Sequence, residues 1–208
     1  SMPSIDLDAI LIAIRIATYG EKMELQVPIR YYENDDLKVG SETIEIDLRT
    51  ILDSMQGKTW NGSMQLGELT FKLRPLTYKE TTQFFMTTFE NQRLSQIMQD
   101  DKVDEDQKMK AFKEGFKKLS QMTLDMVCTN ITSIETPEGI ETNPQAIKQF
   151  FETTDKQTFM SVQKHLEQLK NTWSTPTTKF QVPEDYVEKG ADKTIDVPMV
   201  FDNASFFA

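Results

Sequence analysis

The chain has 208 residues, of which 38% are hydrophobic and 27% charged, a balance that excludes wholesale disorder and lets the chain fold without a disulfide or metal. Thirty-three acidic residues against 23 basic ones give a formal net charge of -10. Because the basic residues are scattered among acidic ones, this charge disfavours nucleic acid and anionic membranes as partners. The single cysteine, Cys128, excludes an intramolecular disulfide and indicates a reducing compartment such as the cytoplasm.

The apolar run 9–17 predicts a short helix, because acidic residues precede it and Gly20 follows it. A buried strand is the alternative, since short apolar runs are ambiguous. Its apolar residues surround the helix axis, so the segment is either buried or docked on a partner, and we take Ile10 and Ile14 as candidate partner-binding residues. The run is interrupted by Arg15 and has no basic region before it, so we expect neither a membrane span nor a signal peptide.

Residues 23–28 and 43–48 alternate between apolar and polar side chains, and a polar, glycine-containing stretch joins them. This pattern predicts an antiparallel β-ribbon closed by a loop. A short helix over 48–55 and a further strand within 66–73 complete a first region that covers about 20–73.

Two long helices are predicted next. Thr77 and Glu80 form a capping-box pattern at the start of the first, in which Thr77 accepts from the helix and Glu80 reaches back. One face of this helix carries Tyr78, Phe85, Phe89 and Ile97. After a hydrophilic break over 99–106, the second helix has apolar residues at steps of 3, 4, 3 and 7, namely Met109, Phe112, Phe116, Leu119 and Met126. This heptad-like seam predicts an antiparallel pair with the preceding helix.

Asn143 before Pro144 predicts the start of a short helix, and Thr154 with Gln157 predicts the cap of the last one. The helical region thus covers about 77–173, and renewed alternation predicts a second ribbon within about 178–201. We therefore expect a single α+β domain over 1–208, with a central helical bundle and antiparallel β-ribbons near both termini.

The two ribbon regions resemble each other. Gln26-Val27-Pro28 matches Gln181-Val182-Pro183, and Thr43–Ile46 matches Thr194–Val197 in the same order. Either the region is duplicated, or such short strings recur by chance, and the sequence leaves both explanations open.

Few residues are suited to catalysis. His165 is the only histidine and Cys128 the only thiol, and neither lies in a nucleophile motif. One Cys and one His cannot make a structural zinc site, and the acidic runs at 34–36 and 100–101 lack the pattern of an EF-hand. No glycine-rich phosphate loop is present. We expect a protein that is not an enzyme and needs no cofactor. The alternative is an enzyme, such as a hydrolase that uses Cys128 or His165.

The C-terminal segment 201–208 ends with Phe206 and Phe207. Free aromatic side chains at a terminus expose a large apolar area, so this tail packs on its own core or on a partner. We therefore add both residues to the candidate partner-binding set.

Several segments together resemble the baseplate hub and hub-assembly proteins of T4-like bacteriophages. They are Leu11–Gly20, Met23–Leu25, Ile46–Leu48, Leu73–Tyr78, Phe150–Phe151, Thr154–Asp155 and Phe201–Phe207. The resemblance spans nearly the whole chain and rests on the order of these pieces. Relatives often carry cysteine pairs in the ribbon regions, like zinc-ribbon knuckles, whereas 29–32 and 184–187 contain none here. Metal binding is therefore not expected of this chain.

The resemblance implies a phage tail baseplate hub assembly factor, a chaperone-like late protein that binds other hub proteins. The alternative is a stoichiometric structural component of the mature baseplate hub. Either role places the protein in the host cytoplasm during assembly or in the tail baseplate of the virion, with no nucleic acid or membrane as partner.

Overall fold

The computed structural model describes residues 2–99 and 104–199. About 51% of the chain is helix and 28% strand, and the sheets are antiparallel, so the predicted α+β class is confirmed. Contacts divide the chain into two compact units, described separately below. The helical unit comprises Ser1–Ile5 and Thr59–Thr172, and the ribbon unit comprises Asp6–Lys58 and Trp173–Ala208. Compact units can belong to one domain or to two, so the single domain stays a prediction.

The helical unit combines four strands with four helices. Its elements are β3 (Ser63–Leu66), β4 (Leu69–Leu73), α3 (Tyr78–Gln99), α4 (Glu105–Asn130), β5 (Ile131–Thr136), β6 (Gly139–Glu141), α5 (Pro144–Thr153) and α6 (Lys156–Trp173). The strands form one antiparallel sheet in the order β3-β4-β5-β6. The hairpin of β5 and β6 lies inside the region that the sequence assigned to helices. Two β-branched residues, Ile131 and Ile134, fill buried positions of β5, and β6 is too short to give a pattern.

The core of the helical unit centres on Phe71, whose side chain is fully buried. The ring of Phe71 lies 5.9 Å from that of Phe151 on α5, measured between centroids. Val127, Val162 and Leu166 bring the end of α4 and the middle of α6 into the same cluster. The sheet is therefore covered by α4, which precedes β5 in the chain, and by α5 and α6, which follow β6.

The start of α3 is held by the predicted capping box. The Thr77 N–H donates to Glu80 Oε2 at 2.8 Å, and the Glu80 N–H donates to Thr77 Oγ1 at 3.3 Å. Arg74 adds a two-pronged contact, because Nη1 and Nη2 donate to the two carboxylate oxygens of Glu80 at 2.9 and 2.7 Å. The end of the sheet is thus joined to the first turn of α3.

Of the caps predicted for α5 and α6, the first is confirmed and the second is wrong. Asn143 Oδ1 accepts from the Gln145 N–H at 2.9 Å, with Pro144 in the first turn, as predicted. The expected cap at Thr154 is wrong, because the Thr158 N–H donates to the Asp155 carboxylate at 2.9 Å and α6 begins at Lys156. Thr154 instead ends α5, and the carboxylate one residue later is the cap.

The ribbon unit is built from both ends of the chain. Its elements are α1 (Leu7–Tyr19), β1 (Lys22–Glu33), β2 (Asp36–Asp47), α2 (Leu48–Met55), β7 (Thr178–Gln181), α7 (Glu184–Val187) and β8 (Thr194–Val197), while a 3-10 turn, η1 (Ser4–Asp6), leads into α1. Strand β1 pairs with β2, and β7 pairs with β8. The helix predicted for the N-terminal apolar run is confirmed over its buried-strand alternative, and Ile12 fully buries its side chain in a cluster with α2.

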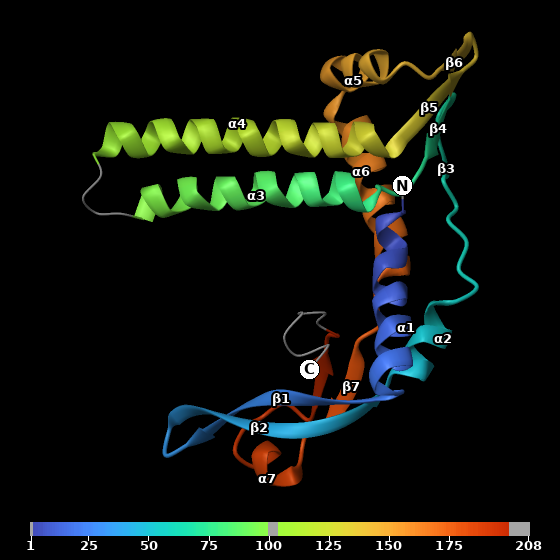
Figure 1. The fold of residues 1–208 in the computed structure, drawn as a ribbon. Coiled ribbons are helices and arrows are strands. Elements are labelled where there is room, and N and C mark those ends of the chain that lie inside the picture. The colour runs from blue at the N-terminus through green and yellow to red at the C-terminus, as the bar shows by residue number, and fades with distance from the viewer. Residues whose placement is uncertain (1, 100–103, 200–208) are drawn as a thin grey trace. The chain divides into compact units, whose positions relative to one another are not determined.

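The first ribbon is longer than the sequence indicates, as Figure 1 shows for β1 and β2. The polar loop expected between 28 and 43 is wrong, since both strands continue to a two-residue turn at Asn34 and Asp35. These residues have φ of 55° and 64°, as a tight hairpin turn with mirror-image geometry requires. Polar side chains are tolerated there because most of this end of the ribbon is exposed, and alternation therefore disappears.

The two ribbons share a register. Gln26 pairs with Thr43 in the first, and Gln181 pairs with Thr194 in the second. The matching strings therefore occupy equivalent pairs of an antiparallel ladder, which favours duplication over chance.

Candidate docking surface

The helices α3 and α4 lie side by side and antiparallel, as predicted (Figure 1). The apolar seam of α4, however, does not face α3 along its length. The side chains of Phe112 and Phe116 are 53% and 65% exposed, and Met109 and Leu119 are exposed beside them. The prediction that this seam pairs the two helices is therefore wrong for these four residues. Met126, the last residue of the seam, is half-buried and lines a cavity together with Phe84 of α3. These four residues, Met109, Phe112, Phe116 and Leu119, are called the α4 stripe below.

A different face of α4 makes the contact with α3. Ala111 is buried and Gly115 is half-buried, and Met122 lies on the same face at a further step of seven. Met122 Sδ accepts from Thr88 Oγ1 of α3 at 3.5 Å. Small side chains let two helices approach closely, so Ala111 and Gly115 are selected for the contact and the larger residues lie away from it.

The α4 stripe combines stacked aromatic rings with a neighbouring hollow. The rings of Phe112 and Phe116 stack with centroids 6.4 Å apart. A hollow of about 470 Å³ borders Phe112 and Met109 near the start of α4. Contiguous apolar patches on a protein surface are typical of sites that bind other proteins.

Lysines flank the α4 stripe. Residues 108–118 contain five lysines and one glutamate, in a chain whose overall charge is -10. Lys108 and Lys113 stand on the two sides of the stripe by helical position. The basic residues are thus less scattered than the composition suggested, and this surface suits an acidic partner.

Exposed apolar residues also occur on α3. Tyr78, Phe85 and Met86 are all exposed. Of the face predicted for this helix, Tyr78 and Phe85 therefore lie in solvent, while the side chains of Phe89 and Ile97 lie outside the described residues.

The partner-binding residues chosen from the sequence lie elsewhere. Ile10 and Ile14 are one turn apart on α1 of the ribbon unit, with 40% and 45% of their surface exposed. Such exposure is what partner binding requires, and their role stays a prediction. Phe206 and Phe207 lie outside the described residues. The sequence identified the residues of the α4 stripe but assigned them to the contact with α3, although Ala111 and Gly115 four residues apart could have indicated which face meets α3.

Cys128 and His165 have surroundings unlike those of reactive groups. Cys128 packs against the core of the helical unit, and burial, followed by nearby Asp125, raises the pKa of its thiol to about 11. His165 Nε2 is buried without a hydrogen-bond partner. Within 2–99 and 104–199, no three His, Cys, Asp or Glu side chains converge as metal ligands would.

No family model, characterised protein or solved structure matches this chain. In the described part of the chain, every helix is too short or too polar to cross a bilayer.

Proposed function

We propose that the chain is a baseplate hub assembly factor of a T4-like phage, a protein that is not an enzyme and acts by binding hub proteins. The α4 stripe, an exposed aromatic surface between lysines, is the observation that supports a docking role. The resemblance in sequence supports the choice of hub proteins as partners.

The physical case for docking rests on exposed rings. Moving a phenylalanine side chain from water into an apolar contact contributes about 1.5–3 kcal/mol. Phe112 and Phe116 lie one turn apart, so a partner helix can cover both rings at once. Lys108 and Lys113 would attract acidic residues that flank the apolar face of such a helix. The proposed ligand is therefore an acidic amphipathic segment of a hub protein.

The experiment compares binding of the unaltered protein and of Phe112→Ser/Phe116→Ser to each hub protein by calorimetry. We expect a loss of at least about tenfold in affinity, because two aromatic contacts disappear. Circular dichroism should show an unchanged fold, since both rings are exposed. Ile140→Ser, which removes an exposed apolar residue from β6, is the matched control and should bind normally. Failure of every hub protein to bind the unaltered chain would contradict the proposal.

Mass spectrometry of purified virions separates a transient role from a permanent one. An assembly factor should be missing from mature particles, although it is abundant in the host cytoplasm during assembly. Stoichiometric amounts in the particles would make the chain a structural component of the hub instead.

A further inference from the structure

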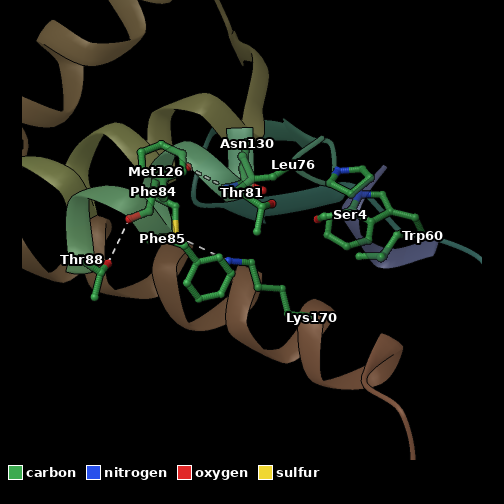
Figure 2. Close-up of a pocket in the computed structure, with 12 residues that line it drawn as sticks. Ser4, Trp60, Leu76, Thr81, Phe84, Phe85, Thr88, Met126, Asn130 and Lys170 are labelled. Atoms are coloured by element: carbon green, nitrogen blue, oxygen red, sulfur yellow. Dashed lines mark hydrogen bonds between the residues drawn. The ribbon is translucent and has the colours of Figure 1, made fainter. Parts of the chain in front are cut away.

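The helical unit contains a cavity of about 280 Å³ beside the first turns of α3 (Figure 2). Its apolar wall includes Trp60, Leu76 and Phe84, while Thr81 and Asn130 contribute polar atoms. The cavity is separate from the α4 stripe, whose four residues do not line it. It has no part in the function proposed above.

Two buried oxygen atoms at this cavity have no hydrogen-bond partner. Asn130 is only 1% exposed, and its Nδ2 donates to the Met126 carbonyl at 2.7 Å, which fixes the orientation of the amide. Its Oδ1 is left without a donor. Thr81 Oγ1, on a residue that lines the same cavity, is also buried and unpaired. Buried polar groups in folded proteins nearly always have partners, so these two atoms indicate a missing one.

The unpaired atoms define the ligand's polar group. An amide oxygen only accepts, so the ligand must donate an N–H or O–H to Asn130. A carboxylate or phosphate would place negative charge against that oxygen and is disfavoured. The rest of the ligand must be apolar, to match Leu76, Phe84 and Trp60.

The volume of the cavity limits the size of the ligand. A cavity of about 150 Å³ lined by aliphatic and aromatic side chains holds benzene, so about 280 Å³ accommodates two fused rings. Lys170 contributes to the same lining, and an ammonium group near an aromatic face is attracted to it. We infer that this cavity binds a planar aromatic group of two fused rings that carries a single N–H or O–H donor, such as indole.

The test uses indole and indene, which have nearly the same shape, but only indole has an N–H. Titration followed by calorimetry and by ¹H–¹⁵N NMR should show indole binding at least about tenfold more tightly, because the buried acceptor is satisfied only by indole. The amides of Thr81 and Asn130 should shift. Equal affinity for both compounds, or no binding of indole, would overturn the inference.

Variants assign the effect to single atoms. Thr81→Val and Asn130→Leu keep the side-chain size and remove an unpaired oxygen, so at least one should lower the preference for indole about tenfold. Thr88→Val is the matched control, since Thr88 also lines the cavity but its hydroxyl donates to the Phe84 carbonyl at 3.0 Å. That variant should keep the preference. If Asn130→Leu does not fold, the comparison of indole with indene on the unaltered protein still decides, and equal affinity for the two compounds would overturn the inference.

The source of the aromatic group is distinguished by N-acetyltryptophanamide, which carries the indole on a peptide-like backbone. Binding of both compounds at the same amides supports a tryptophan side chain of a partner protein. Binding of indole alone supports a free small molecule. Either result is consistent with the proposed ligand chemistry.

Discussion

The rings of Tyr31 and Tyr186 meet edge to face in the ribbon unit, with centroids 5.2 Å apart. Each tyrosine stands four positions after the valine of a Gln-Val-Pro string, Val27 in one ribbon and Val182 in the other. Equivalent positions of the two copies therefore contact each other. The match is one of sequence position, because Tyr31 lies on β1 and Tyr186 on α7.

Two further contacts join the two ribbon regions. A Cβ atom on Gly40 of the first ribbon would lie 2.8 Å from Tyr186 Cε1, and one on Gly190 would lie 3.3 Å from Tyr32 Cδ2. Each copy thus places a tyrosine against a glycine of the other. The Tyr32 N–H also donates to the Lys189 carbonyl at 2.8 Å.

Gly40→Ala should destabilise the protein by about 1–3 kcal/mol, because the added methyl group overlaps the Tyr186 ring. Urea unfolding measures the change. In a Tyr186→Leu background the same substitution should have a much smaller effect, since the ring is gone. Equal losses in both backgrounds would show that Tyr186 is not the cause.

Glu80→Gln should destabilise the helical unit by about 1–3 kcal/mol at pH 7. Hydrogen bonds, from Arg74 above all and then from Thr77, lower the pKa of Glu80 to about 2, from 4.5. Since the folded state holds the ionised form, this contribution is complete above about pH 4.5 and is lost as the pH falls toward 2. Thermal unfolding should therefore show a large difference between variant and unaltered protein at pH 7 and a small one at pH 2. Glu114→Gln on the exposed face of α4 is the control, and it should change little at either pH.

Cys128 should react with iodoacetamide at pH 8 at least about 100-fold more slowly than an unperturbed thiol, because a pKa of about 11 leaves little thiolate. The rate is measured by mass spectrometry. Protein unfolded in urea should react at the ordinary rate, which separates the effect of burial from that of local sequence. Fast reaction of the folded protein would show that the thiol is activated and would support a catalytic role.

Ala111→Leu should lower the free energy of unfolding by about 1–3 kcal/mol, because a larger side chain forces α3 and α4 apart. Phe112→Leu, at the adjacent exposed position, should change stability by less than about 0.5 kcal/mol. Chemical denaturation compares the two. A greater loss for Phe112→Leu would mean that the α4 stripe, rather than Ala111, faces α3.

Local signals in the sequence predicted the helices and strands well, whereas the packing of these elements against one another was harder to predict. The cap at Thr77 and Glu80 and the start of α5 at Asn143 are confirmed, because each depends on residues a few positions apart. The length of β1 and β2 was missed, since the polar end of a ribbon has no apolar alternation to detect. Which face of α4 meets α3 depends on a contact with a distant helix.

For the candidate sites, too, local patterns were predicted and contacts between distant residues were not. The α4 stripe was visible as a periodic pattern, but periodicity does not say whether an apolar face is covered. The cavity beside α3 was not visible, because it takes residues as far apart as Trp60 and Asn130. Nothing in the sequence marked Asn130 as a binding residue, because asparagine is common at the end of a helix.

Because β1 and β2 precede the helical unit in the chain and β7 and β8 follow it, the ribbon unit cannot be completed during synthesis until β7 and β8 have left the ribosome. The intervening stretch 59–172 emerges earlier and holds nearly all of the helical unit. Until then Ile29, which ends up fully buried beside Val182 and Ala191, has no cover. A chain that ends before residue 178 would contain the complete helical unit. Its β1–β2 hairpin would lack β7 and β8, and its uncovered side chains and strand edges would be exposed to other chains.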